Sequence, residues 1–124
     1  MTDEERTFLL AAVKKASEQW KTAFNSGDAP GCASHYEAEA VMTAEPFGEF
    51  RGKETIQAFW QKLIEDGFSD VEYVDPRIDV IDPKSAVLES AWKMNKAKGV
   101  IYRELWVLQD DRSVKLREDH FAAL

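Results

Sequence analysis

Two glutamates and a histidine near the end of the chain have spacings that suit acid–base chemistry. Glu104 lies in one stretch that alternates apolar and polar residues, and Glu118 and His120 lie in the next. If these stretches pair as antiparallel strands around a turn at 110–112, Glu104 faces Glu118. Like charges across a strand pair raise the pKa of at least one carboxyl, so one of the two can hold a proton at neutral pH.

The hydrophobic pattern favours the register in which Gln109 pairs with Ser113. This register places Trp106 opposite Leu116, whereas a slip by one residue would place the indole opposite Arg117. The predicted pairing therefore follows from which side chains can share a face.

The preceding strand brings aromatic residues to the same face. Met94 is expected opposite Val100, and this pairing aligns Trp92 with Tyr102. The predicted inner face carries Leu88, Ser90, Trp92, Tyr102, Glu104, Trp106, Leu116, Glu118 and His120. Buried carboxylates are costly unless they are paired or protonated, so this mixture of aromatic and acidic groups favours a ligand cavity over a plain core.

The reverse face of the same strands predicts contact with another subunit. An ion pair is expected there between Arg103 and Asp119. The apolar residues of this face include four that the helices cannot all cover: Ile101, Leu105, Val107 and Phe121. The helices have the other face to cover, and exposed apolar patches of this size mark interfaces, so we expect a homodimer through the sheet.

Three helices and a run of strands must position these groups. Apolar residues recur at steps of three and four over Thr2–Asn25, which predicts a long amphipathic helix with a capping box. Asp28 is expected to cap a short helix that ends near Tyr36, and a third helix lies between Gly52 and Gly67. Strands are expected over 40–44, 69–82, 86–94, 99–109 and 113–123. This order predicts the α+β class.

The composition indicates one folded acidic domain over residues 1–124. Lys and Arg number 16 and Asp and Glu number 23, for a net charge of −7. Nucleic acids and anionic membrane surfaces are bound by clustered Lys and Arg, so neither is an expected partner. The sequence lacks the basic and apolar regions of a signal peptide and any apolar run long enough to span a membrane. We therefore expect a cytoplasmic protein.

Neither a disulfide nor a metal centre is expected. Cys32 is the single cysteine, and we expect it to be a small buried residue. The two histidines, His35 and His120, have no metal-ligand spacing with each other or with the acidic residues. We expect no cofactor.

Three stretches of sequence carry a family resemblance. They are WKTAFNSGD at 20–28, AVMTAEPFG at 40–48 followed by RGK at 51–53, and YRELWVL at 102–108. With the order of helices and strands, they resemble the NTF2-like superfamily, specifically its ketosteroid-isomerase-like or SnoaL-like branch. The resemblance implies a cone-shaped, cystatin-like α+β fold, in which a curved sheet wraps the long first helix around a pocket.

The resemblance also implies roles for three residues. In the isomerases of this branch a carboxylate base follows the first strand, while a protonated carboxyl on a late strand and a tyrosine on the first helix form an oxyanion hole. These positions correspond to Glu45, Glu104 and Trp20, so an indole replaces the phenol. We expect Glu45 to remove a proton from carbon while a neutral Glu104 donates a hydrogen bond to the oxyanion.

Two classes of function follow from the sequence. The first is a cofactor-independent isomerase, cyclase or dehydratase that acts on a small hydrophobic carbonyl compound, with Glu45 and Glu104 as catalytic residues. The second is a non-catalytic ligand-binding or dimerisation module with the same fold. In either case the expected pocket residues are Trp20, Phe24, Tyr36, Phe59, Trp92, Tyr102, Trp106, Glu118 and His120. The aromatic ones can instead be ordinary core residues.

Overall fold

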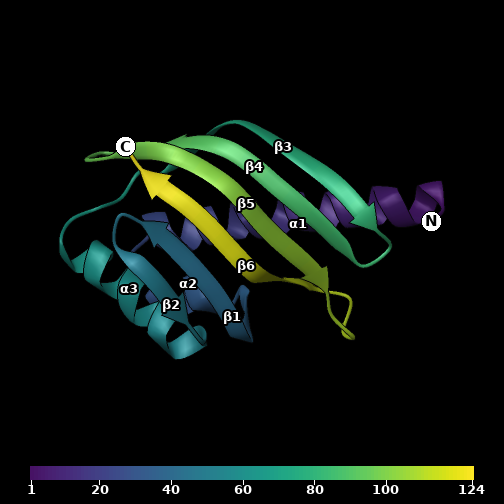
Figure 1. The fold of residues 1–124 in the computed structure, drawn as a ribbon, viewed down its shortest axis with the longest axis horizontal. Helices are drawn as coiled ribbons and strands as arrows, with labels where there is room; N and C mark the ends of the chain where they lie inside the picture. Colours follow the sequence, from purple (N-terminus) through teal and green to yellow (C-terminus); the bar gives the residue numbers. More distant parts are fainter.

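The computed structural model describes residues 1–124 and contains three helices and one sheet of six strands. The elements are α1 (Asp3–Asn25), α2 (Ala29–Ala33), β1 (Tyr36–Glu45), β2 (Gly48–Arg51), α3 (Lys53–Glu65), β3 (Glu72–Asp82), β4 (Ser85–Lys93), β5 (Lys98–Leu108) and β6 (Val114–Ala123). The strand order is β2-β1-β6-β5-β4-β3, and only β1 and β6 pair in parallel. Figure 1 shows the sheet curving over α1, with α3 beside β1 and β2. The predicted α+β class is confirmed, and none of the helices is long and apolar enough to cross a membrane.

A local capping box fixes the start of α1, and a contact with a distant part of the chain fixes its end. Thr2 and Glu5 form the predicted capping box, in which each backbone N–H donates to the other side chain, over 2.8 and 3.0 Å. At the other end the Asn25 amide donates to the carbonyl of Val71 at 3.1 Å and accepts from its N–H at 2.7 Å. These bonds hold α1 beside the start of β3 and position Trp20, which α1 buries.

The second helix is shorter than predicted and the first strand is longer. α2 ends at Ala33, and Tyr36 already begins β1. Asp28 caps α2 as expected by accepting a hydrogen bond from the N–H of Gly31 at 2.9 Å. The chain leaves the helix because Tyr36 pairs with Leu116 of β6, a partner too distant in the sequence for local periodicity to reveal. β2 is a further difference, since the predicted break after the first strand is a tight hairpin.

The register of β5 against β6 is as predicted near their turn and then shifts. Trp106 lies opposite Leu116, but irregularities beyond this pair change the partners that follow. Glu104 consequently faces Asp119 and not Glu118, which corrects the predicted carboxyl pair. Side chains alternate along a strand, so each extra residue moves those beyond it to the other face.

Several residues therefore lie on the face opposite to the predicted one. Ile101 and Phe121, expected outside, are buried in the core. Three residues expected on the inner face lie on the outer one: Tyr102, Glu118 and His120.

β4 pairs with β5 in a register that also differs from the prediction. Trp92 lies opposite Gly99 and not Tyr102, and Leu88 lies opposite Glu104. The indole of Trp92 packs directly on Gly99, where an added Cβ would lie 2.6 Å from the ring. Trp92 and Glu104 nevertheless both face inward, as expected.

The outer face of the sheet mixes ion pairs with apolar residues. Arg103 contacts Glu118 at 3.5 Å, so the predicted pair with Asp119 is wrong. Of the four apolar residues that motivated the homodimer, Leu105 and Val107 stay on this face, half-buried. The homodimer through this face stays a prediction.

Candidate active site

The inner face of the sheet, α1 and α3 enclose a cavity of about 190 Å³. Twenty residues line it, and seventeen of them are hydrophobic. The exposed members of the lining are Phe47 and Lys96, in the turns that follow β1 and β4. The cavity therefore opens between these turns, and its buried wall carries Glu104 and Asp119.

Six of the predicted site residues line this cavity. They are Trp20, Tyr36, Phe59, Trp92, Glu104 and Trp106. Phe24 is fully buried but lies one layer behind, stacked on Trp20 with ring centroids 5.4 Å apart. Four others lie outside the lining: Glu45, Tyr102, Glu118 and His120.

Glu45, the expected base, pairs with His120 on the outer surface. Its carboxylate contacts the imidazole Nε2, and the two side chains are 52% and 41% exposed. The Tyr102 ring packs on His120 with centroids 5.0 Å apart. Side chains alternate along β1, so Glu45 points outward while Ala44 is buried in the core. The structure thus does not bring Glu45 and Glu104 together around one ligand.

Glu104 and Asp119 instead form a buried carboxyl pair with few partners. The indole N–H of Trp106 donates to Glu104 Oε1 at 3.0 Å. The hydroxyl of Tyr36 donates to Asp119 Oδ2 at 2.6 Å, and its oxygen accepts from the indole N–H of Trp60 at 3.3 Å. Asp119 Oδ1 is buried and has no hydrogen-bond partner.

Burial sets the protonation of this pair. It raises the pKa of Asp119 to about 6, against the hydrogen bond from Tyr36, which lowers it. Burial and then the charge of Asp119 raise the pKa of Glu104 well above its ordinary value, with the Trp106 hydrogen bond acting in the opposite direction. At neutral pH the pair therefore holds one proton on Glu104, while Asp119 is the carboxylate.

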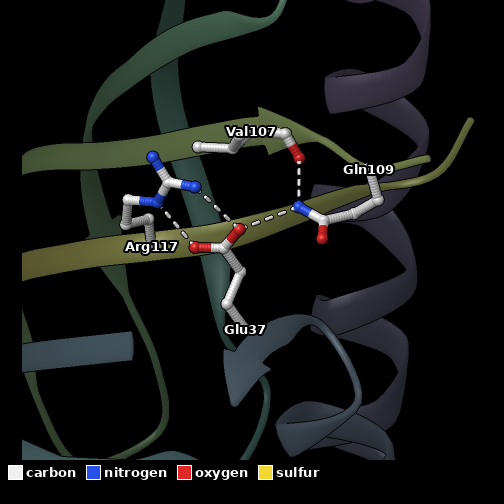
Figure 2. Close-up of polar contacts among 4 residues, drawn as sticks. All are labelled: Glu37, Val107, Gln109 and Arg117. Carbon is white, nitrogen blue, oxygen red and sulfur yellow. Dashed lines mark hydrogen bonds and ion pairs between the residues drawn. The ribbon is translucent and has the colours of Figure 1, made fainter. Parts of the chain in front are cut away.

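The outer face of the sheet positions the donor to Asp119. Figure 2 shows Glu37, the residue after Tyr36, accepting hydrogen bonds from Arg117 Nε and Nη2 at 2.7 and 3.2 Å. Gln109 Nε2 donates to the same carboxylate at 3.0 Å and to the carbonyl of Val107 at 2.9 Å. This clamp joins β1, β6 and the end of β5. Because adjacent residues of a strand face opposite ways, it holds Tyr36 toward the cavity.

Other reactive groups lie apart from the pair. No three His, Cys, Asp or Glu side chains gather where they could hold a metal ion. Cys32 is buried, and burial raises the pKa of its thiol to about 12, so the thiol is protonated.

The family follows from a match that covers most of the chain. The family model for the SnoaL-like domain matches residues 17–118. The chain belongs to the SnoaL-like family. The SnoaL-like branch of the NTF2-like superfamily, which the sequence motifs predicted, is therefore confirmed. No match was found among the curated proteins.

Solved structures share the fold of this SnoaL-like domain. A protein designated a candidate scytalone dehydratase, from Novosphingobium aromaticivorans, has a TM-score of 0.83 at 11% identity over 99% of this chain and 89% of its own. A ketosteroid isomerase-like protein from Erwinia carotovora has a TM-score of 0.80 at 17% identity over 93% and 95%. An NTF2-like protein from Pseudomonas putida has a TM-score of 0.77 at 14% identity over 92% and 85%. At these identities the similarity shows the fold alone.

Asp119 is the residue of the SnoaL-like site that sequence reasoning missed. The signal for it is a break in the apolar alternation. Leu116 and Phe121 are both buried but lie five positions apart, as do Ile101 and Trp106 on the neighbouring strand. An odd interval between two residues of one face requires an irregularity between them, and the shift turns Asp119 inward.

Proposed function

We propose that this SnoaL-like protein is a cofactor-independent acid–base enzyme, of the isomerase, cyclase or dehydratase kind, that acts on a small hydrophobic carbonyl compound. One observation carries the proposal. Asp119 and Glu104 are neighbouring buried carboxyls in the lining of one apolar cavity, and Oδ1 of Asp119 has no hydrogen-bond partner in the protein. A carboxylate freed of water and hydrogen bonds is a stronger base than one in solution.

The two carboxyls divide the chemistry between them. Asp119 Oδ1 removes a proton from the carbon next to the carbonyl, and the electron pair of that C–H bond moves toward the carbonyl oxygen. Protonated Glu104 donates a hydrogen bond to the oxygen as its negative charge develops. In an isomerisation Asp119 returns the proton to a different carbon, whereas in a dehydration Glu104 gives its proton to a departing hydroxyl group.

Tyr36 supports the base without touching the reacting carbon. Its pKa is raised well above the ordinary value, chiefly by burial and then by the charge of Asp119, so the phenol stays a donor. The hydrogen bond to Oδ2 stabilises Asp119 as a carboxylate and leaves Oδ1 for the substrate. The dehydratase and isomerase-like names of two similar structures agree with this class of reaction.

Exchange of carbon-bound hydrogen tests the proposal without a known substrate. The protein is incubated in deuterated buffer with a panel of small cyclic ketones, and mass spectrometry follows deuterium uptake. We expect enzyme-dependent uptake, and a fall of about 100-fold or more for Asp119→Asn and for Glu104→Gln. Glu89→Gln, which changes an exposed carboxylate of β4 that pairs with Arg77, is the matched control and should not alter the rate.

Two results would contradict this assignment. Unchanged exchange in Asp119→Asn together with loss in Glu45→Gln would move the base to the surface pair with His120. Binding of ketones without any exchange would make the protein the non-catalytic ligand-binding module, which is the alternative that the sequence left open.

A further inference from the structure

Tyr73 of β3 lines the cavity beside the carboxyl pair, and its hydroxyl makes no hydrogen bond within the protein. This hydroxyl keeps accessible surface, unlike the indole N–H groups of Trp20 and Trp92, which the surrounding atoms seal. Buried polar groups without a partner are rare in native proteins because each is destabilising. The Tyr73 hydroxyl is therefore both free and open to a molecule that enters.

The Tyr73 hydroxyl lies deep in the protein and close to both carboxyls. Burial is the chief cause that raises its pKa well above the ordinary value, followed by the charge of Glu104 and then by that of Asp119. The stronger effect of Glu104 indicates that the hydroxyl lies nearer to Glu104 than to Asp119. Because the hydroxyl is buried, its accessible surface opens into the cavity that Tyr73 lines.

The other side-chain donors of the cavity lining are already bonded, sealed or at the opening. The bonded ones are Tyr36, Trp60 and Trp106, and the sealed ones are Trp20 and Trp92. Lys96 lies at the opening, where its ammonium donates to the carbonyl of Asp66 at 2.8 Å. Apart from protonated Glu104, Tyr73 is thus the one residue of the buried wall with a free donor.

The reacting oxygen of the proposed mechanism has a place for a second donor. A carbonyl oxygen carries two lone pairs, and protonated Glu104 occupies one of them. Negative charge grows on this oxygen as the proton leaves carbon, and a hydrogen bond to a charged oxygen is about twice as strong as one to a neutral oxygen. A phenol beside Glu104 meets this demand.

We infer that Tyr73 is a further catalytic residue, whose hydroxyl donates to the substrate oxygen beside the hydrogen bond from Glu104. Asp119 removes the proton from carbon, and the electron pair of that C–H bond moves to the oxygen that both donors hold. The phenol keeps its own proton throughout. The family resemblance implied a donor on the first helix, but the N–H of Trp20 is sealed there, so β3 supplies the donor instead. This inference rests on the proposed function, because it adds a donor to the same site.

Deuterium exchange of the ketone panel tests the role of this single hydroxyl. Tyr73→Phe removes it without breaking a hydrogen bond of the protein. We expect the exchange rate at saturating ketone to fall about 100-fold, as for the loss of one oxyanion donor. The half-saturating concentration should change much less, because the bond strengthens only as charge develops. Tyr102→Phe removes an exposed phenol outside the cavity lining and is the matched control, which should exchange at the unaltered rate.

Two results of this experiment would overturn the inference. An unchanged rate at saturating ketone would mean that the Tyr73 hydroxyl does not contact the reacting oxygen. A higher half-saturating concentration with the same saturated rate would make Tyr73 a binding residue without a part in catalysis.

A measurement on the unaltered protein covers the case in which Tyr73→Phe fails to fold. The probes are cyclohexanone and methylenecyclohexane, which has a CH₂ group in place of the carbonyl oxygen. An apolar cavity of about 150 Å³ admits benzene, so a cavity of about 190 Å³ admits either probe. The tyrosines are labelled with carbon-13 at the ring carbon that bears the hydroxyl, and NMR follows their signals.

The Tyr73 signal should move more with cyclohexanone than with methylenecyclohexane, because only the ketone accepts its hydrogen bond. Tyr36, which already donates to Asp119, and Tyr102, which lies outside the lining, should show no such difference. Equal movement of the Tyr73 signal with the two probes would contradict the contact with the carbonyl oxygen.

A failure of this inference is distinguishable from a failure of the proposed function. Exchange that is lost in Asp119→Asn but kept in Tyr73→Phe would reject the role of Tyr73 and keep the enzyme. No exchange of any ketone by the unaltered protein would reject the enzyme, and the catalytic role of Tyr73 with it.

Discussion

Glu104 of β5 and Asp119 of β6 lie directly opposite each other, and both side chains are buried in the wall of the same cavity. Each carboxyl accepts one hydrogen bond, Glu104 from an indole and Asp119 from a phenol. Neither has a basic partner, so two negative charges at this place would be strongly unfavourable. The pair therefore behaves as one unit that holds a proton at neutral pH.

This arrangement predicts that stability falls as the pH rises from about 4 to about 7. Burial raises the pKa of Asp119 and of Glu104 in the folded protein, so the folded state keeps protons that the unfolded chain has released. Their stabilising effect is complete below the unfolded pKa values and is lost as the pH passes the folded ones. Urea unfolding at a series of pH values measures this slope.

Two variants separate the pair from the rest of the protein in that measurement. Asp119→Asn removes one of the two groups, and we expect a shallower fall in the free energy of unfolding. Glu89→Gln changes an exposed carboxylate and should keep the slope of the unaltered protein. The hydrogen bond from Arg117 lowers the pKa of Glu37, and burial lowers the pKa of His35, so these two groups change the stability in the opposite direction, Glu37 at lower pH. A free energy of unfolding that rises between pH 5 and pH 7 would contradict this account.

Removing the Tyr36 hydroxyl should destabilise the fold and make Asp119 less readily ionised. Tyr36→Phe leaves Asp119 Oδ2 and the indole N–H of Trp60 without their partner, which should cost about 1–3 kcal/mol of stability. The pKa of Asp119 should rise further, and a carbon-13 NMR titration of the Asp119 carboxyl measures it. Tyr73→Phe removes another phenol of the same cavity and is the matched control. An unchanged titration of Asp119 in Tyr36→Phe would show that the hydroxyl does not stabilise the carboxylate.

The parts of the fold that depend on near neighbours could be predicted from the sequence. The capping box of Thr2 and Glu5 and the helix between Gly52 and Gly67 need only a few adjacent residues, and both are confirmed. The start of β1 at Tyr36 depends on pairing with β6, which lies far along the chain. Helical spacing could not reveal that partner, so the second helix was predicted too long.

The candidate site was predictable only in part, for a related reason. Glu104 was placed correctly because it alternates with Trp106, two positions away on an undistorted part of β5. The sequence prediction placed His120 on the inner face and Asp119 on the outer face, the reverse of the structure, because it continued strict alternation past a bulge. The family resemblance predicted that Glu45 is the catalytic base, but its side chain points outward to His120.

The clamp on the outer face should matter more than its exposure suggests. Arg117 holds Glu37 through two hydrogen bonds, and the Glu37 side chain is only 19% exposed. Arg117→Met should therefore cost about 1 kcal/mol of stability, since paired bonds to a sheltered carboxylate exceed a typical surface ion pair. Arg77→Met, which breaks the exposed pair with Glu89, is the control and should cost less. Urea unfolding compares the two, and equal costs would mean that the clamp is an ordinary surface pair.

The predicted homodimer now depends on a smaller apolar patch than the sequence indicated. Leu105 and Val107 remain on the outer face, while Ile101 and Phe121 are buried inside. Sedimentation should still give twice the chain mass of 14.1 kDa, because half-buried apolar side chains between charged ones suit a two-fold interface. Leu105→Glu should produce a monomer, since it would bring two unpaired carboxylates into that interface.

A second acidic substitution controls for added charge. Ile81→Glu changes an exposed residue of the edge strand β3 and should leave the dimer intact. A protein that sediments as a monomer at all concentrations would end the case for this interface. Dissociation by both variants alike would mean that net charge, and not the patch at Leu105 and Val107, controls association.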